Sequence, residues 1–258
     1  LPKTAWPPTC IRRIADISTV LVPVMTLLYL GGGLAVILGN LRRLPGAVTL
    51  MLRCAVAPEA ALGGALGIVT RREALRWGVA RSVFSNEAGL GSAAITAACA
   101  DTEDPVKQGL ISMTGVFFDT MVICTVTGLA ICCSGTLGTA DGAGRPLTGA
   151  ALTLRAFETV LGPLAPWLIG VALGLFAFTS VLGCAVQAET TASYLLGPEA
   201  VRPCRVLYGL AVFAGAVIPM ATVLQLADLA NALMAFPNLV CLLLLSGEIA
   251  GECGRKDR

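Results

Sequence analysis

The segment Phe84–Ser92, which reads FSNEAGLGS, combines residue types that can hold a carboxylate or a cation. Its glycines let backbones approach closely, while Ser85, Asn86 and Glu87 supply oxygens and amides. If a membrane helix unwinds here, free amide groups can hold a carboxylate and free carbonyls can hold a cation. A carboxylate inside a bilayer is costly, so Glu87 indicates a functional site. The alternative is that Glu87 lies near the membrane interface and pairs with an arginine such as Arg81.

A second acid, Asp119, lies in an apolar stretch that begins near Val106. The same cost of burying a charge makes Asp119 a candidate functional residue. The alternative is a structural anchor, hydrogen-bonded to neighbouring Thr or Ser hydroxyls.

The composition excludes several kinds of functional site. Of 258 residues, 56% are hydrophobic and 13% charged, with a mean hydropathy of +0.81. A net charge of +2 gives no basic field for nucleic acid. The absence of histidine excludes Ser/His/Asp triads, Cys/His dyads and His-ligated metal sites. Most of the ten cysteines lie in apolar runs without a CxxC pair, so we interpret them as small hydrophobic residues.

These residues must be positioned by membrane helices, because several uncharged stretches have the roughly 20 residues that span a bilayer. Five ordinary spans are predicted at Ile17–Leu41, Thr120–Ala140, Pro163–Ala188, Val206–Ala227 and Leu229–Gly247.

Residues 42–104 differ from these spans. Arg71, Arg72, Glu73, Arg76 and Arg81 interrupt a Gly- and Ala-rich stretch before the SNE sequence at 85–87, and residues 88–100 are again uncharged. This pattern predicts a sixth crossing, a helix broken around Phe84–Ser92. A re-entrant or interfacial helix pair is the alternative.

Six crossings place both chain ends on one side of the membrane. Lys and Arg divide nine against nine between the two sides, so the positive-inside rule decides nothing. We prefer both ends inside because the cluster Arg255–Arg258 is compact and close to a span. The tail 248–258 is then cytoplasmic, and the protein is expected to be a multi-pass protein of a bacterial inner membrane.

Long stretches of the sequence resemble the sodium:alanine (amino acid carrier) symporter family. The resemblance is carried by GVARSVFSNEAGLGSA at 78–93 and PVKQGLISMTGVFFDTMVICTVTGLAI at 105–131. Further agreement comes from VPVMTLLYLGGGLAVILGN at 22–40, LTGAALTLRAFETVLG at 147–162, FAFTSVLG at 176–183 and MAFPNLVCLLLLSG at 234–247. It covers residues 11–247 and leaves residues 1–10 unmatched.

The resemblance implies an all-α, leucine-transporter-like fold of two inverted five-helix repeats. Ile17–Leu41 would be the fifth core helix, Phe84–Ser92 the break in the sixth, and Thr148–Gly162 an external capping helix. Pro163–Leu196 would be the eighth, and the last two spans the ninth and tenth. The first four core helices have no counterpart, so we expect a C-terminal half that cannot transport by itself.

The resemblance also assigns roles to individual residues. The implied substrate-binding residues are Phe84, Ser85, Asn86, Gly89, Gly91, Ser180 and Cys184. Thr179 and Ser180 would offer hydroxyl ligands to sodium, which favours hard oxygen donors. Alternatively, such hydroxyls bond back to their own helix. A small cavity suits alanine or glycine, and sodium would be the coupling ion, with no other cofactor.

Two departures from the family pattern affect the eighth helix. Cys184 occupies the position of a usual tryptophan, which is expected to enlarge or reshape the cavity. Residues 186–190, Val-Gln-Ala-Glu-Thr, replace a Tyr-Tyr-Gly-Glu-Arg-like run. Glu189 thus keeps the acidic residue of this run. Thr190 stands where the run has its basic residue, so Glu189 lacks that neighbour.

We therefore expect a secondary active transporter, not an enzyme, that couples sodium to uptake of a small neutral amino acid by alternating access. Its partners would be alanine or glycine, sodium and the lipid bilayer, without nucleic acid. One alternative is a non-functional transporter remnant or a structural membrane subunit. Another is an intramembrane aspartyl protease using Asp119 and Asp228, but their contexts, FFDT and QLADLA, lack the GxGD signature.

Overall fold

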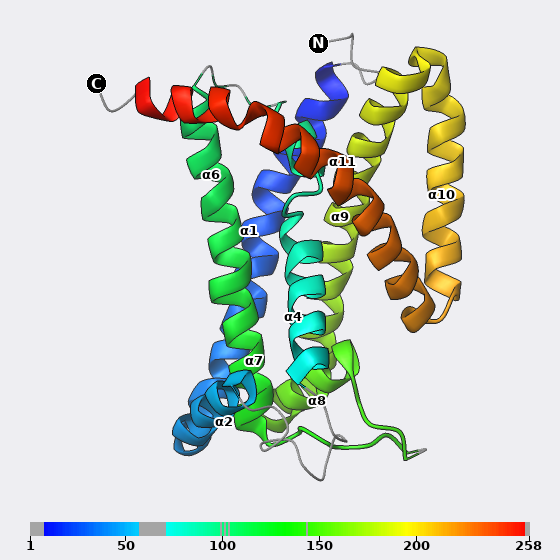
Figure 1. The fold of residues 1–258 in the computed structure, drawn as a ribbon. Coiled ribbons are helices and arrows are strands. Elements are labelled where there is room, and N and C mark those ends of the chain that lie inside the picture. The colour runs from blue at the N-terminus through cyan, green and yellow to red at the C-terminus, as the bar shows by residue number, and fades with distance from the viewer. Residues whose placement is uncertain are drawn as a thin grey trace. The chain divides into compact units, whose positions relative to one another are not determined.

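The protein is helical throughout the part that the structure describes (Figure 1). This computed structural model describes residues 8–56, 71–98, 100, 102, 104–142 and 144–255. Apart from one isolated bridge between Ala140 and Pro146, the described residues contain no β-structure, which confirms the all-α prediction. The helices are α1 Pro8–Gly39, η1 Leu41–Arg43, α2 Leu44–Val56, α4 Arg71–Asn86, α5 Ser92–Ala97, α6 Pro105–Phe117, η2 Phe118–Cys124, α7 Thr125–Ser134, α8 Gly149–Leu161, η3 Gly162–Leu164, α9 Ala165–Leu196, η4 Pro198–Ala200, α10 Val201–Val217 and α11 Met220–Arg255.

Five stretches of the described chain are long and apolar enough to cross a membrane. They are Ile17–Gly39, Pro105–Ser134, Gly149–Leu196, Pro198–Val217 and Met220–Glu248. Each overlaps one of the five ordinary spans predicted from the sequence. The sixth predicted crossing corresponds to α4 and α5, which contain 16 and 6 residues and are separately shorter than a span.

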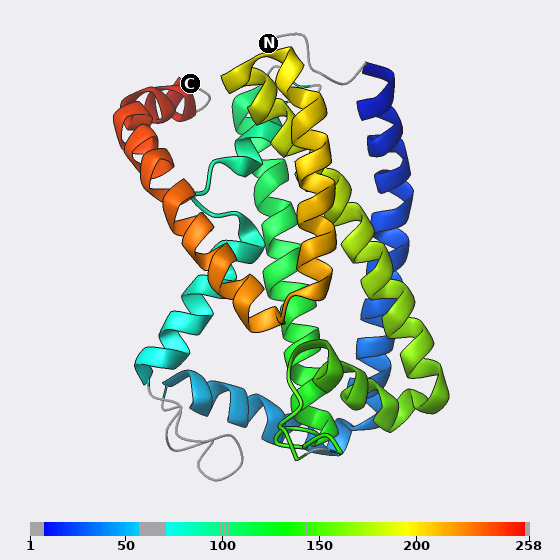
Figure 2. The ribbon, with the colours of Figure 1, turned by 90° about the vertical axis from the view of Figure 1, so that its right-hand side faces the viewer.

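The boundary between the last two spans differs from the prediction. The sequence placed it at Asp228, between Val206–Ala227 and Leu229–Gly247, because a charge usually ends an apolar run. In the structure the chain turns at Ile218–Pro219, and Asp228 lies inside α11 (Figure 2). Proline lacks an amide hydrogen, so it ends α10, and its own carbonyl accepts the first bonds of α11 at 3.0 and 3.2 Å.

The helices form two compact units. The first comprises Leu1–Ile14, Ala80–Phe117 and Ser180–Arg258, and the second comprises Ala15–Val79 and Phe118–Thr179. Several helices therefore contribute one part to each unit.

The second unit has a core built on close helix packing by glycine. A Cβ on Gly32 would lie 2.9 Å from Phe157 of α8, and one on Gly33 would lie 2.5 Å from Val126 of α7. The absence of side chains lets α1 approach both helices. The core around Phe157 consists of Tyr29, Val36, Ile37, Ala130, Ala156, Phe157, Ala165, Ile169 and Ala172.

One polar contact crosses this core. The Thr127 hydroxyl donates to the Ile123 carbonyl at 2.7 Å, so the Tyr29 hydroxyl, 2.8 Å from the Thr127 oxygen, is the donor between them. The Tyr29 ring also lies 5.6 Å from that of Phe157, centroid to centroid. The hydrogen bond to Thr127 satisfies the Tyr29 hydroxyl, which would be costly to bury without a partner.

The span Pro105–Ser134 contains a π-helical segment, η2, which carries Asp119. π-Helical turns are rare and often occur at functional sites. The span ends at Ser134, where Gly135 adopts a left-handed conformation with φ of 73°, earlier than the predicted end at Ala140.

In the first unit, α10 and α11 are joined by the short turn at Pro219, and α11 bends along its course (Figures 1 and 2). Pro237 lies inside α11, where it lacks the amide that would bond to the Leu233 carbonyl one turn earlier. The bend is the expected result of a proline within a helix.

Candidate functional site

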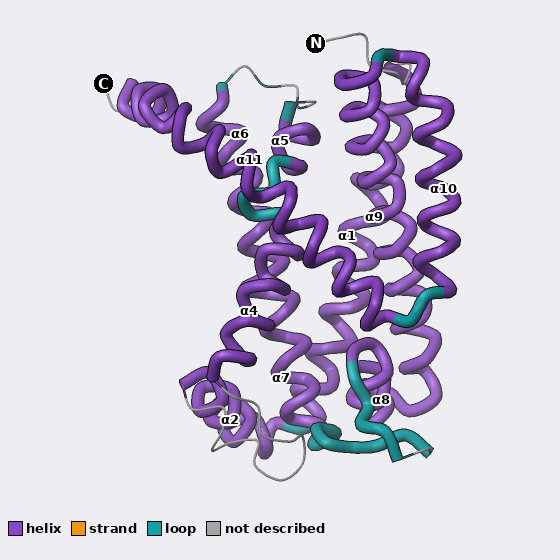
Figure 3. The backbone as a smooth tube through the Cα atoms, turned by 45° about the vertical axis from the view of Figure 1, so that its right-hand side comes forward, coloured by secondary structure: helices purple, strands orange, loops and turns teal. Residues whose placement is uncertain are grey.

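The helix interruption predicted at Phe84–Ser92 is present in the structure. Helix α4 ends at Asn86 and α5 begins at Ser92, with a loop between them (Figure 3). Within this break Glu87, Gly89 and Gly91 have positive φ angles of 50, 74 and 83°. Glycine adopts such angles freely, but for Glu87 the left-handed conformation costs about 1–2 kcal/mol. Contacts of its side chain must therefore offset this cost.

The Glu87 carboxylate is held from both sides of the break. Its Oε2 accepts a 2.5 Å hydrogen bond from the Ser92 hydroxyl, at the start of α5, and lies 3.4 Å from the Gln187 amide nitrogen of α9. Ser92 is buried, which strengthens the contact. Glu87 thus braces the broken helix and connects it to α9.

Arg81 does not pair with Glu87, contrary to the alternative interpretation of the sequence. It forms an ion pair with Asp228 of α11, and its guanidinium lies 5.6 Å from the centre of the Phe84 ring. Both charged side chains are about one-third exposed, at 32% and 34%. The pair neutralises both charges, as expected for ionisable residues in a membrane. A carboxylate engaged in this way is not placed for the dyad of an aspartyl protease.

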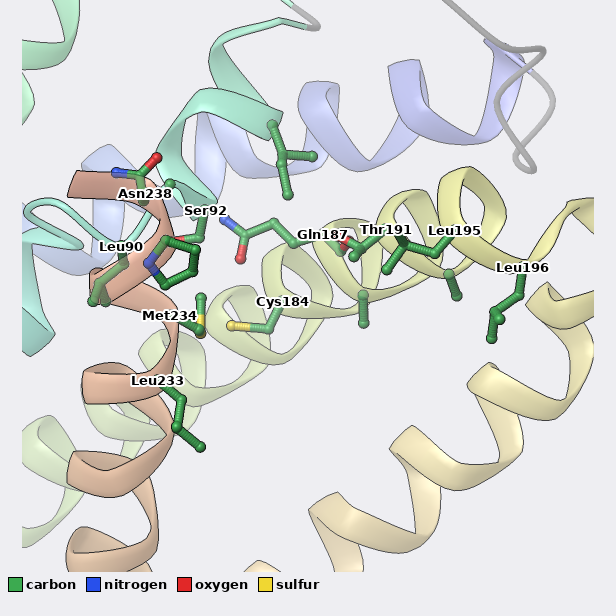
Figure 4. A pocket seen from close by; sticks show the side chains of 15 residues that line it. Leu90, Ser92, Cys184, Gln187, Thr191, Leu195, Leu196, Leu233, Met234 and Asn238 are labelled. Carbon is green, nitrogen blue, oxygen red and sulfur yellow. The ribbon is translucent and has the colours of Figure 1, made fainter. Parts of the chain in front are cut away.

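A pocket of about 910 Å³ opens beside the break (Figure 4). It lies between α5, the second part of α9 and α11, all in the first unit. Most of its lining is apolar. Figure 4 shows two side chains of α9 directed across the pocket, Cys184 toward Met234 and Gln187 toward Ser92. Its polar side chains are Ser92, Gln187, Thr191 and Asn238. An apolar pocket with a few convergent polar groups is typical of a small-molecule site.

Asn238 ties the loop of the break to α11. Its amide nitrogen donates to the Gly89 carbonyl at 3.0 Å. A Cβ on Gly91 would lie 2.9 Å from the Asn238 side-chain oxygen, so only glycine fits at that position. The close fit fixes the loop at the edge of the pocket.

The predicted substrate residues are only partly brought together. Gly91 and Cys184 line the pocket, and Gly89 reaches it through Asn238. Four others belong to the same unit but are not among its lining residues, namely Phe84, Ser85, Asn86 and Ser180.

The other two predicted residues, Thr179 and Asp119, belong to the second unit. The Thr179 hydroxyl lies 3.0 Å from the carbonyls of both Leu175 and Phe176, so it bonds back to its own helix, as the alternative interpretation stated. Asp119 lies in the π-helical segment and is partly exposed. Their roles stay predictions.

Comparison with known proteins identifies the family. The profile of the sodium:alanine symporter family matches residues 9–254, nearly the whole chain. The chain belongs to this family. Symporters are integral membrane proteins, which agrees with the five apolar stretches of spanning length.

Curated relatives include several bacterial and archaeal carriers. The chain is 43% identical over 243 residues to an uncharacterized transporter of Haemophilus influenzae, covering 94% of this chain and 52% of that protein. It is 38% identical to the sodium/alanine symporter AgcS of Methanococcus maripaludis, with the same coverage. It is also 38% identical to the probable sodium/glutamine symporter GlnT of Bacillus subtilis, covering 92% and 48%. The chain spans about half the length of these relatives.

In this chain of the symporter family, Glu189 has a basic partner on another helix. Its carboxylate is 2% exposed and accepts two bonds from Arg205 of α10, at 2.8 and 3.0 Å. The cation missing at Thr190 is thus supplied from the next helix. A two-bond contact of this kind is among the strongest that charged side chains make.

Sequence reasoning did not assign a role to Gln187 or Asn238 in this member of the symporter family. Both are single amides within apolar helices, and Asn238 follows Pro237 directly. A lone amide in a span usually has a hydrogen-bond partner. That signal was available for both residues, but their partners, Glu87 and Gly89, lie about 100 or more residues away in sequence.

Proposed function

We propose that this chain forms part of a sodium-coupled symporter for a small neutral amino acid, working by alternating access. The observation that carries the proposal is the break at 87–91, where the helix is interrupted beside a pocket. Backbone without helical bonds is tolerated at membrane depth only where it lines a protein cavity. Family membership and the names of the relatives support the same activity.

The residues at the break suggest how a substrate would be held. Loop amides would bind the carboxylate of an amino acid, and loop carbonyls would bind its ammonium group or sodium. Glu87, fixed by Ser92 and Gln187, would keep the loop open in one conformation. This rigidity lowers the cost of ordering the site when the substrate binds.

The Thr179 and Ser180 hydroxyls are our proposed sodium ligands. Thr179 uses its hydrogen for the helix carbonyls, so the lone pairs of its oxygen remain available to a cation. Bonding back to the helix is therefore compatible with a role as a ligand.

Alanine or glycine is our proposed substrate. The curated relatives include proteins named for alanine and for glutamine. Cys184 contributes a small side chain to the wall of the pocket. Part of that wall would come from the half of the relatives that this chain does not match.

We further propose the leucine-transporter-like fold for the whole carrier, with α4 and α5 as the broken sixth core helix and α8 as the capping helix. The expected location is a bacterial inner membrane, with both ends of this chain inside. Two observations support the proposed fold, namely the break itself and the semi-polar helix α8 that precedes α9.

Uptake by the full-length carrier that contains this chain tests the proposal. Membrane vesicles with an inward sodium gradient should accumulate labelled alanine, and replacing sodium by choline should abolish accumulation. Unlabelled glycine and glutamine, added as competitors, define the substrate. Equal uptake in choline would refute sodium coupling.

Glu87→Gln tests the site itself, with Glu199→Gln as the matched control. Glu199 lies exposed on η4, whereas the Glu87 carboxylate holds the loop. We expect the Glu87 variant to lose at least tenfold in uptake and the control to keep it. Equal uptake by both variants would show that the break is not the site.

A further inference from the structure

A second pocket, of about 470 Å³, lies in the second unit where α1 meets η1. It is lined by the consecutive residues Leu38, Gly39, Asn40, Leu41, Arg42 and Arg43. The apolar part of α1, Ile17–Gly39, has 23 residues and is about 34 Å long at the usual helical rise. This length matches the roughly 30 Å hydrocarbon core of a bilayer. The pocket, directly after Gly39, therefore lies at the level of the lipid headgroups.

The charged residues that line this pocket, Arg42 and Arg43, are both positive. Between residues 17 and 56 the sequence contains Arg42, Arg43 and Arg53 and neither Asp, Glu nor Lys. None of the ion pairs found in the described part of the chain involves these arginines. Arginine binds phosphate with parallel hydrogen bonds from its planar guanidinium.

The two arginines of the pocket have different surroundings. The Arg43 guanidinium donates to the Ser134 carbonyl at 3.2 Å, where it holds the end of α7. Arg42 is exposed beside it. Arg43 thus has a structural contact as well, whereas Arg42 is available to a ligand.

Helix α2 continues the pocket with three distinct faces. One face packs on α7 through Ala47, which is 4% exposed, and Met51, whose methyl group lies against Gly128. A second face exposes Val48 and Leu52, at 40 and 65% exposure, and with the exposed Leu41 of the preceding η1 (53%) these residues form an apolar stripe.

The third face of α2 is polar and carries Thr49 and Arg53, and Arg42 lies in η1, just before α2. Figures 1 and 2 show α2 turned across the end of α1 within this unit. A helix with apolar and basic faces exposed side by side is typical of the plane between headgroups and acyl chains.

We propose that this corner binds an anionic phospholipid. Its phosphate lies in the pocket between Arg42 and Arg43, and its acyl chains run along the stripe Leu41, Val48 and Leu52. The two arginines of the lining select an anionic headgroup, and the adjoining apolar stripe selects a lipid over a soluble anion. The site does not depend on the transport proposal, since it uses none of the residues at the break.

Native mass spectrometry of the purified chain in detergent tests this site with added phosphatidylglycerol or phosphatidylcholine. We expect phosphatidylglycerol to bind at least tenfold more tightly. Arg42→Gln should weaken that binding about fivefold, the usual effect of one arginine near an anionic membrane surface. The control is Arg155→Gln, because Arg155 is already paired with Glu158 on α8. It should leave lipid binding unchanged.

Three results would overturn the proposal: equal binding of both lipids, an Arg42 variant no weaker than the Arg155 variant, or displacement of phosphatidylglycerol by millimolar inorganic phosphate. The last result would mean that the pocket takes a free anion. Circular dichroism of each variant verifies the helical fold. Arg43→Gln should lose both lipid binding and thermal stability, because it also removes the bond to α7.

Discussion

The bond between Glu189 and Arg205 gives a quantitative test of how α9 and α10 are held together. Glu189 is 2% exposed, and its two oxygens accept from Nε and Nη2 of Arg205 at 2.8 and 3.0 Å. Arg205→Gln leaves the carboxylate buried without its cation. Breaking a buried pair from one side costs about 3–5 kcal/mol. Because the Arg205 side chain is 56% exposed, we expect the lower end, about 3 kcal/mol.

Unfolding in mixed dodecylmaltoside and SDS micelles, followed by tryptophan fluorescence, measures this loss. A change of about 3 kcal/mol lowers the ratio of folded to unfolded protein roughly a hundredfold. Arg202→Gln is the matched control, because Arg202 is exposed one turn earlier on the same helix, and it should change stability by less than about 0.5 kcal/mol.

The double variant Glu189→Gln with Arg205→Gln separates charge burial from packing. Two neutral amides leave no uncompensated charge, so the double variant should recover most of the loss, with a coupling of about 2 kcal/mol. The reasoning would be refuted by an Arg205 variant that loses under about 1 kcal/mol. It would equally be refuted by a double variant no more stable than the single one.

Three further predictions concern other positions. Gly91→Ala should destabilise the protein by about 1–2 kcal/mol, because φ is 83° and the new Cβ would meet Asn238 at 2.9 Å. Its control is Gly46→Ala, in open space on α2, which should stabilise the protein by about 0.5–1 kcal/mol in the same unfolding assay. Cys184→Trp should fill part of the pocket and weaken inhibition of alanine uptake by glutamine more than inhibition by glycine, measured by competition in the full-length carrier. Tyr29→Phe should cost about 1 kcal/mol in unfolding, because it removes the donor to a threonine oxygen on α7, and an unchanged stability would mean that this bond contributes nothing.

Local composition predicted the features that depend on neighbouring residues. The break at Glu87–Gly91 follows from the glycines and polar residues that interrupt the helical pattern there, and the five apolar spans follow from their length. The turn at Pro219 was missed because Asp228, a charge, was a stronger signal than a proline. In the structure that charge is tolerated within α11 because Arg81 neutralises it.

The contacts between distant helices could not be predicted in this way. Arg81 pairs with an acid 147 positions later, and Glu87 contacts Gln187, 100 positions later. The sequence offered a nearer partner for each, since Arg81 and Glu87 are close together in the chain. Which pairs form is decided by how α9 and α11 pack beside the break, which periodicity within one helix does not specify.

The π-helical segment Phe118–Cys124 also determines where the span Pro105–Ser134 can change in length. A π turn closes with an i→i+5 bond, so it holds one residue more than an α turn. Deleting a residue elsewhere in the span would rotate everything after it by about 100° and turn buried Ala130 and Cys133 away from the core. A deletion within the π segment instead converts a wide turn into an α turn and keeps both flanking helices in phase. Insertions and deletions in related chains should therefore concentrate in these seven residues.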